Sequence, residues 1–277
     1  MNKILFKQEL APGIKKIVLE APLVAKKVLP GEFVVLIVDE KGERVPLTVV
    51  DSDKEKGTIT LIFQEVGKTT YKLGELKAGE VILNLLGPLG RATEIKKLGT
   101  VVTVGGGVGI AEVYPVTRAF KEAGNSIISI IGARTKDLLI LEKELREMCD
   151  ELFITTDDGT YGRRGFVSDV LKETIGSTKV DLVYAVGPVP MMRKVSELSR
   201  PYGIKTLVSL NPVMVDATGM CGSCRVSVGG ETKFGCVDGP EFDGHLVDFA
   251  QLEKRLNLFS EQEKRAMECF KSKGNEG

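Results

Sequence analysis

Short hydrophobic runs at close spacing characterise the first third of the chain. Glycine, proline or aspartate separates them, and several runs alternate hydrophobic with polar positions. This pattern is typical of antiparallel strands with one buried face, and it predicts a small antiparallel β-barrel over residues 1–97. The expected strands cover residues 14–20, 33–38, 45–50, 58–63 and 79–86.

Beyond residue 98 the periodicity changes. Five hydrophobic runs of strand length alternate with stretches that have the periodicity of a helix. Strands interleaved with helices predict a parallel sheet covered on both faces, and therefore an α/β domain over residues 98–210. The expected strands are 100–104, 126–131, 151–155, 180–186 and 205–209, and the expected helices are about 110–123, 137–149, 166–175 and 190–200.

Neither periodicity continues after residue 210. A segment rich in glycine and cysteine follows, and a charged stretch of helical periodicity occupies about 246–272. The predicted fold class is therefore an N-terminal antiparallel β-barrel, a parallel α/β nucleotide-binding domain and a small C-terminal module over residues 211–277.

The composition narrows the class of protein. A chain of 277 residues has room for two ordinary domains and a small third region. The formal net charge is zero, which disfavours a nucleic-acid-binding surface, and no hydrophobic run reaches the length of a membrane helix. The N-terminus shows no signal-peptide cleavage site, so we expect a cytoplasmic protein whose cysteines stay reduced.

Three of the five cysteines are clustered in "VDATGMCGSCRVSVGGETKFGC". Cys221, Cys224 and Cys236 have the spacing C-x2-C-x11-C, whose first pair can share one metal ion. With Asp216 the pattern becomes D-x4-C-x2-C…C, the plant-type 2Fe–2S spacing with its first ligand changed. We therefore predict an iron–sulfur cluster at these four residues, with a structural zinc ion or unliganded cysteines as the alternatives.

A glycine-rich loop joins the first strand of the α/β region to its helix. It consists of Gly105, Gly106, Gly107, Val108 and Gly109. A glycine turn before a helix N-terminus leaves room for a pyrophosphate over exposed amide groups, although close packing of strand and helix would also explain the glycines.

Two further strand ends have turn residues at the edge of the sheet where an open α/β sheet binds its ligand. "TTDDGTYGRRG" contains Asp157 and Asp158, and "AVGPVPMM" contains Gly187 and Pro188. Both aspartates are also ordinary turn formers. Arg134, after the second strand, would suit the 2′-phosphate of NADP.

The order of barrel, α/β region and cysteine segment resembles the ferredoxin–NADP+ reductase superfamily, in its branch with a C-terminal 2Fe–2S module, over nearly the whole chain. "RVPLT" is similar to the family's Arg-x-aromatic-Ser/Thr segment, with the arginine one position upstream at Arg44. "VGKTTYKL" is similar to its second FAD segment, "GGGVGIA" to its nicotinamide-nucleotide loop and "VGPVPMM" to its C-G-P-x-x-M segment. The resemblance implies contacts to FAD from Pro46, Leu47, Thr48, Gly67, Lys68, Thr69 and Thr70.

Two families within this branch share further motifs with the chain. "TTDDGTYGRRGFV" resembles a segment of the electron-transfer subunits of NAD-linked dihydroorotate dehydrogenases. Aspartate as the first cluster ligand resembles instead the small subunits of NADH-dependent reduced ferredoxin:NADP+ oxidoreductases, which are electron-bifurcating transhydrogenases. The latter resemblance implies that Asp216 is the missing ligand and that NAD(H) rather than NADP(H) binds.

The resemblance also implies the chemistry. FAD would exchange hydride with NAD(H) and pass single electrons through the 2Fe–2S cluster to a larger subunit with its own flavin and 4Fe–4S clusters. Ferredoxin would react through that subunit, in a heterodimer. No acid–base residue is needed, which is consistent with a single histidine, His245. The dihydroorotate dehydrogenase subunit and a zinc-stabilised, non-catalytic binding module remain the alternatives.

Overall fold

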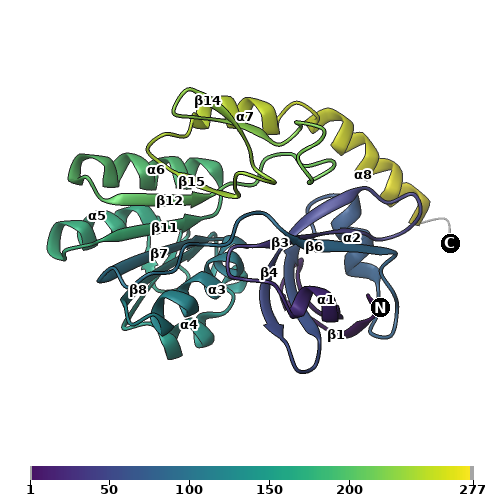
Figure 1. Ribbon diagram of the computed structural model, residues 1–277, viewed down its shortest axis with the longest axis horizontal. Helices are drawn as coiled ribbons and strands as arrows, with labels where there is room; N and C mark the ends of the chain where they lie inside the picture. The colour runs from purple at the N-terminus through teal and green to yellow at the C-terminus, as the bar shows by residue number, and fades with distance from the viewer. Residues whose placement is uncertain (1, 275–277) are drawn as a thin grey trace.

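The computed structural model describes residues 2–274. Residue 1 of the predicted barrel and residues 275–277 of the predicted C-terminal module lie outside the described residues. Figure 1 shows the barrel beside the α/β sheet, with the C-terminal segment lying across the top of both. This arrangement confirms the predicted fold class.

Six antiparallel strands form the first sheet, in the order β1-β2-β5-β4-β3-β6. Its two edges meet because the Ile4 amide donates to the Glu80 carbonyl at 2.8 Å and the Gly79 amide donates to the Ile4 carbonyl at 2.7 Å, which closes a barrel. The elements are β1 (Ile4–Ala11), β2 (Ile14–Glu20), α1 (Pro22–Ala25), β3 (Phe33–Ile37), β4 (Arg44–Asp53), β5 (Thr58–Gln64), α2 (Lys68–Glu75) and β6 (Asn84–Leu89).

Two features of the barrel differ from the prediction. The strand β1 was not expected, and its hydrophobic residues Leu5 and Phe6 are about half exposed, so they do not mark a buried face. The last strand begins at Asn84 rather than residue 79, because residues 79–82 turn back to close the barrel against β1.

The second sheet has the order β10-β9-β8-β7-β11-β12-β15 and is parallel except for its last strand. Its strands β7 to β12 and the helices between them confirm the predicted alternation. The elements are β7 (Thr100–Gly106), α3 (Gly109–Glu122), β8 (Ser126–Ala133), η1 (Lys136–Leu138), α4 (Glu142–Met148), β9 (Glu151–Thr156), β10 (Arg163–Arg164), α5 (Val167–Ser177), β11 (Leu182–Val186), α6 (Val189–Ser199), η2 (Arg200–Tyr202) and β12 (Lys205–Ser209).

The C-terminal segment is built into this sheet. Its strand β15 (Glu241–Asp243) pairs antiparallel with β12, and Phe242 joins the hydrophobic core of the α/β domain. The predicted tail helix is two helices, α7 (Phe249–Leu256) and α8 (Ser260–Gly274). A hairpin of β13 (Arg225–Val228) and β14 (Glu231–Phe234) lies between the cysteines.

The three regions share cores. Ala11, Ile14, Val50 and Ile62 of the barrel pack with residues of α3, β8 and β9. On another face of the barrel, Phe33 and Val35 of β3 pack with Met214, Ala217, Cys224 and Cys236. The barrel is therefore fixed against both the nucleotide-binding sheet and the cysteine segment.

Replacing Phe242 with alanine should lower the free energy of unfolding by about 3–5 kcal/mol, because a buried aromatic side chain leaves a cavity in the shared core. The control is Phe259→Ala, since Phe259 is 51% exposed and its loss should cost under about 0.5 kcal/mol. Urea denaturation followed by circular dichroism measures both. Equal losses would contradict a core shared between sheet and C-terminal segment.

Candidate functional site

The outward face of β4 connects the two parts of the candidate site. Side chains of a strand alternate between its faces, and Val45 and Leu47 pack toward the barrel core. Arg44, Pro46 and Thr48 therefore lie on the opposite face. From Arg44 to Thr48 this face runs about 14 Å.

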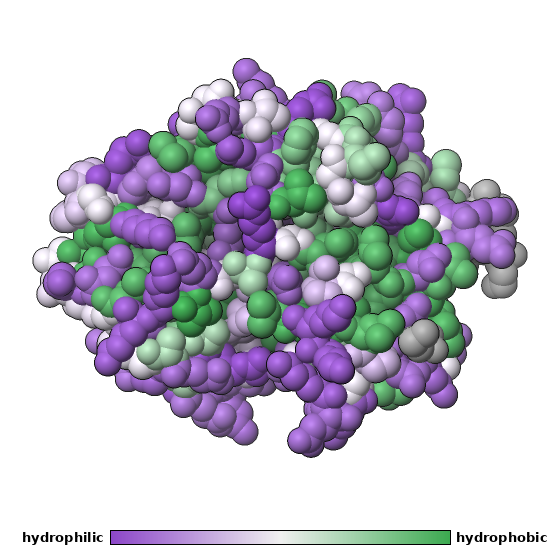
Figure 2. All heavy atoms as spheres, viewed as in Figure 1, coloured by the Kyte–Doolittle hydropathy of each residue, from purple (hydrophilic) through white to green (hydrophobic). Residues whose placement is uncertain are grey.

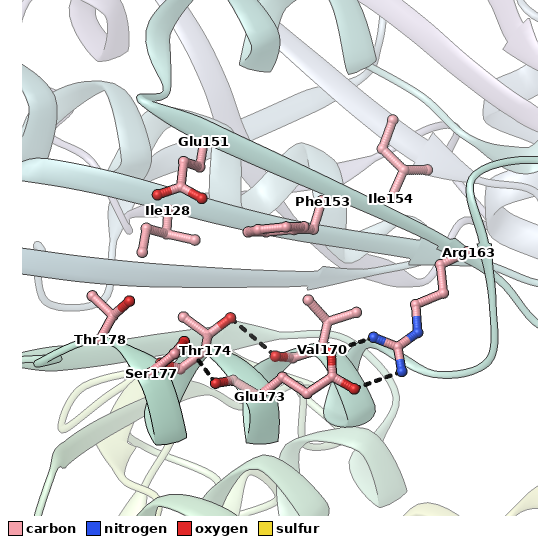
Figure 3. A pocket seen from close by; sticks show the side chains of 10 residues that line it. All are labelled: Ile128, Glu151, Phe153, Ile154, Arg163, Val170, Glu173, Thr174, Ser177 and Thr178. Atoms are coloured by element: carbon pink, nitrogen blue, oxygen red, sulfur yellow. Dashed lines mark hydrogen bonds and ion pairs between the residues drawn. The ribbon is translucent and has the colours of Figure 1, made fainter.

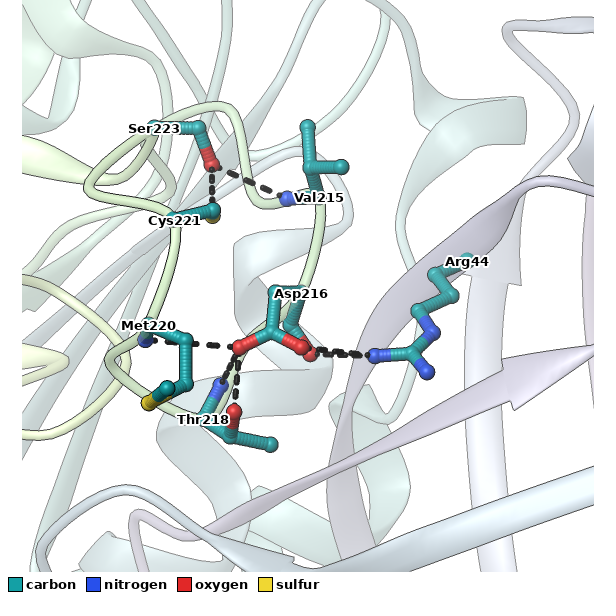
Figure 4. A network of polar contacts seen from close by, with 7 residues as sticks. All are labelled: Arg44, Val215, Asp216, Thr218, Met220, Cys221 and Ser223. Carbon is teal, nitrogen blue, oxygen red and sulfur yellow. Dashed lines mark hydrogen bonds and ion pairs between the residues drawn. The ribbon is translucent and has the colours of Figure 1, made fainter.

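One end of this face contacts the loop that carries Asp216 and the first two cysteines, residues 215–224, which we call the cysteine loop (Figure 4). The Nη1 atom of Arg44 donates to the backbone oxygen of Asp216 at 2.8 Å and to its Oδ1 at 3.1 Å. The other carboxylate oxygen accepts from the hydroxyl and amide of Thr218 and from the amide of Met220. These hydrogen bonds, those of Thr218 first, and the charge of Arg44 lower the pKa of Asp216 and hold it as the anion.

The four predicted cluster ligands form an inner and an outer pair. Cys224 and Cys236 are each 2% exposed, and their sulfur atoms are 3.2 Å apart. Burial, followed by the neighbouring thiol of Cys224, raises the pKa of Cys236 to about 12. Two buried thiols this close suit a cation that replaces their protons.

Asp216 and Cys221 form the outer pair. The thiol of Cys221 is exposed and lies 3.1 Å from the hydroxyl of Ser223, and hydrogen bonds from Ser223 and from the Asp216 backbone lower its pKa. Within residues 2–274, no three His, Cys, Asp or Glu side chains converge as a ready-made metal site. Three thiols and one carboxylate, with two of the thiols adjacent, fit the four anionic ligands of a two-iron cluster.

The inner pair also has nearly the spacing that a shared metal requires. Two sulfurs bound to one tetrahedral metal at ~2.3 Å lie about 3.8 Å apart. Cys224 and Cys236 must therefore separate by only about half an ångström.

The other end of the β4 face contacts the helix that follows the glycine loop. The hydroxyl of Thr48 donates to Oε2 of Glu112 at 3.2 Å, and Glu112 lies in the first turn of α3. Sequence reasoning missed Glu112, although a lone carboxylate in the apolar stretch "GIAEVYPV" marks it.

Both explanations of the glycine loop apply, at different residues. A Cβ on Gly109 would lie 2.5 Å from the Val186 carbonyl oxygen, so close packing of the backbone requires this glycine, and a Cβ on Gly105 or Gly106 would crowd Ile110 or Met191. Gly107 has φ +57° and no atom within 4 Å of such a Cβ. Gly107 therefore faces open space, where a ligand can approach.

The predicted nucleotide segments meet at the carboxyl edge of the sheet. A Cβ on Gly187, beside Pro188, would lie 3.1 Å from the Gly106 carbonyl, so the loops after β7 and β11 touch. After β8 and β9, the Asp158 amide donates to the Arg134 carbonyl at 3.2 Å.

Asp157 and Asp158 lie in the turn after β9. The carboxylate of Asp158 accepts from the amide and hydroxyl of Thr160, which is the behaviour of a turn former, and these hydrogen bonds lower its pKa. Arg134 is exposed on the neighbouring loop.

The segment predicted to be the second FAD segment forms the N-terminus of α2. Gly67 faces open space, so the first amides of α2 at Lys68 and Thr69 can be approached by a phosphate. The hydroxyl of Thr70 turns inward instead and accepts from the amides of Val66 and Gly67. Thr70 therefore caps the helix and leaves ligand contacts to its neighbours.

A buried carboxyl lies where the three regions join. Glu241 of β15 accepts from the Tyr184 hydroxyl of β11 at 2.8 Å and from the Thr93 hydroxyl, and burial raises its pKa. Its partners are distant in sequence, so no local pattern predicts it.

A separate surface cavity of about 240 Å³ lies between β9 and α5 (Figure 3). An ion pair of Arg163 and Glu173 borders it. It contains none of the predicted site residues.

Family models match both functional regions. A model of oxidoreductase NAD-binding domains matches residues 103–197, and a model of the iron–sulfur cluster binding domain of dihydroorotate dehydrogenase B matches residues 211–248. No helix in residues 2–274 is long and apolar enough to cross a membrane.

Relatives cover nearly the whole chain. A dihydroorotate dehydrogenase B electron transfer subunit homolog of Thermotoga maritima is 48% identical over 98% of this chain and 95% of its own. An electron transfer subunit of dihydroorotate dehydrogenase B from Bacillus cereus is 32% identical over 87% of this chain and 95% of its own.

Solved structures with the same fold also match most of this chain. A chain in the structure of the NADH-dependent reduced ferredoxin–NADP oxidoreductase, described for flavin-based electron bifurcation, has a TM-score of 0.93 and 47% identity, with 98% of both chains covered. Phthalate dioxygenase reductase, at 18% identity and a TM-score of 0.61 over 82% of this chain and 85% of its own, shares the fold alone.

In the metal-free chain, Cys221 should react with iodoacetamide much faster than Cys224 or Cys236, because Cys221 is exposed and the other two thiols are buried. Exposed Cys269 is the internal reference. Mass spectrometry of timed digests measures each thiol, and equal rates at Cys221 and Cys224 would contradict the division into an inner and an outer pair.

Proposed function

The chain belongs to the family of dihydroorotate dehydrogenase B electron-transfer subunits and their homologues, and from this membership we propose its function. It is the FAD and 2Fe–2S subunit of an NADH-dependent reduced ferredoxin:NADP+ oxidoreductase, an electron-bifurcating transhydrogenase. The observation that carries the proposal is the outward face of β4, which contacts the helix of the glycine loop at Thr48 and the cysteine loop at Arg44. The 47% identity to a chain of such an enzyme supports it.

The barrel, residues 1–97, would hold FAD against β4 and α2. Pro46 and Thr48 would contact it with side chains, and Leu47, whose side chain packs inward, with its backbone. The amino end of α2, at residues 67–69, would bind phosphate, with Thr70 as the helix cap. When bound, FAD supplies conversion between a two-electron hydride and single electrons.

Residues 98–210 would bind NAD(H) at the carboxyl edge of the parallel sheet. The helix after the β7 loop contacts Thr48, and the β7 and β11 loops touch each other, so these two loops suit the nicotinamide end. The loops after β8 and β9, with Arg134, Asp157 and Asp158, would then receive the adenosine end.

Residues 211–277 would hold the cluster through Asp216, Cys221, Cys224 and Cys236. Asp216 stands where the plant-type spacing has its first cysteine. Carboxylate and thiolate are both anionic ligands, so an aspartate there leaves the total ligand charge unaltered. Arg44 would orient Asp216 from the barrel through its backbone and side-chain oxygens.

The relatives are subunits of larger assemblies by name, and we assign this chain a larger partner subunit with its own flavin and 4Fe–4S clusters. The surface beside the cluster loop suits such an interface. Met220 is 87% exposed and Val215 57%. Hydrophobic side chains also gather in patches over the barrel half of the face in Figure 2.

An electron-transfer subunit of dihydroorotate dehydrogenase is the second candidate, because several relatives carry that name. The two candidates differ in the partner. Purification with a dihydroorotate-oxidising subunit would select the second, and purification with a larger flavin and iron–sulfur subunit the first. The match to an iron–sulfur domain favours both over a zinc-stabilised binding module.

The chain purified without oxygen should contain one FAD, two irons and two acid-labile sulfides, and NADH should bleach its flavin absorption. Flavin extraction, iron and sulfide assays and visible spectroscopy measure this. Zinc in place of iron, in a colourless protein, would refute the electron-transfer function.

Arg44→Met should lower the midpoint potential of the cluster by tens of millivolts, because loss of a nearby positive charge disfavours the reduced, more negative cluster. Redox titration monitored by electron paramagnetic resonance measures the potential. Arg146→Met is the control, since Arg146 is an exposed arginine that pairs with Glu142 within α4, away from the cysteine loop. The same potential in wild type and Arg44→Met would refute the role of Arg44.

A further inference from the structure

Glu112 is an unusual residue for its surroundings. Its neighbours Ile110, Ala111 and Val113 in α3 are fully buried, and its carboxyl is directed across the domain interface to the hydroxyl of Thr48. Thr48 belongs to the face of β4 that would contact FAD.

Among the side chains of residues 2–270, no Lys, Arg or His forms an ion pair with Glu112. The hydroxyl of Thr48 is its hydrogen-bond donor, and the buried phenol of Tyr184 is the titratable group that senses its charge. Glu112 is half-buried, and partial burial with no cation paired to it disfavours a carboxylate.

Burial accordingly raises the pKa of Glu112 to about 7, against the opposing hydrogen bond from Thr48. The amino end of α3 also favours the anion, but a helix dipole of 0.3–1 kcal/mol changes a pKa by less than about one unit. Glu112 therefore gains and loses its proton near neutral pH.

We propose that Glu112 is a proton-exchanging residue of the flavin site, coupled to it through the hydroxyl of Thr48. This inference rests on the proposed function, which places FAD against Thr48. Nothing in the family matches assigns Glu112 a role.

The coupling follows from charge balance. Hydride transfer from NADH moves two electrons and one hydrogen nucleus and releases NAD+, so one negative charge is added beside Thr48. That charge disfavours the Glu112 carboxylate, which takes up one proton from water. When the electrons leave one at a time toward the cluster, the hydrogen nucleus that came with the hydride is released to water as a proton, and Glu112 returns its own proton to water as well.

The dependence on pH follows from the same argument. Below pH 6 Glu112 is already protonated before the flavin is reduced, so it takes up nothing further. At pH 8 it is ionised beside oxidised flavin and takes up a proton on reduction, up to about one per flavin.

The test measures proton uptake with a pH-indicator dye in weakly buffered, FAD-loaded protein reduced anaerobically by NADH at pH 6 and pH 8. The variants are Glu112→Gln, which preserves the shape without the proton, and Glu122→Gln at the exposed far end of the same helix. At pH 8, wild type and Glu122→Gln should take up more protons than Glu112→Gln, by up to about one per flavin. At pH 6 all three should agree.

Equal uptake by all three proteins at pH 8, with normal FAD content and reduction by NADH, would overturn the role of Glu112 and leave the proposed function standing. Failure of the wild type to bind FAD or to be reduced by NADH would overturn both. Infrared spectroscopy gives a second readout. A carboxylic acid band present at pH 6 and lost at pH 8.5 in wild type, but absent from Glu112→Gln, supports the role, and identical spectra contradict it.

Discussion

The alternation of side chains along β4 is the constraint on which the site depends. Val45 and Leu47 must face the barrel core, so strand geometry sets Arg44, Pro46 and Thr48 on the outer face. A slip of one residue in the pairing of β3 with β4 would exchange the two sets. The contacts to Asp216 and to Glu112 would then be lost together, because both depend on the same register.

The C-terminal segment is attached rigidly, so the cysteine loop keeps a fixed position against the outward face of β4. β15 extends the nucleotide-binding sheet, and Phe242 and Leu252 share its core. The cysteines meanwhile pack against Phe33 and Val35 of the barrel. The cysteine loop is therefore held from two sides, and its position relative to β4 does not depend on the exposed Arg44–Asp216 ion pair, which contributes at most about 1 kcal/mol.

Local sequence patterns predicted the elements whose hydrophobic residues face a core. The strands β2, β3, β5 and β7 follow their apolar runs closely, whereas β1 was missed because Leu5 and Phe6 point outward. The short β15 was also missed, since three residues carry no periodicity. Spacing selected the four candidate ligands, but contacts between residues 172 and 64 positions apart, which join β4 to Asp216 and Glu112, leave no signal in a local pattern.

The pairing with Arg44 offers a physical reason for an aspartate at position 216. A thiolate is a weak hydrogen-bond acceptor, whereas a carboxylate has a second oxygen that can accept a charge-assisted hydrogen bond while the first binds a metal. Arg44 reaches both the side chain and the backbone of Asp216, so the barrel can orient this ligand directly. Cysteine would keep only the backbone contact. An aspartate therefore links the electrostatics of the barrel to the cysteine loop, and the three cysteines, whose contacts lie within the loop and the apolar core, do not provide that link.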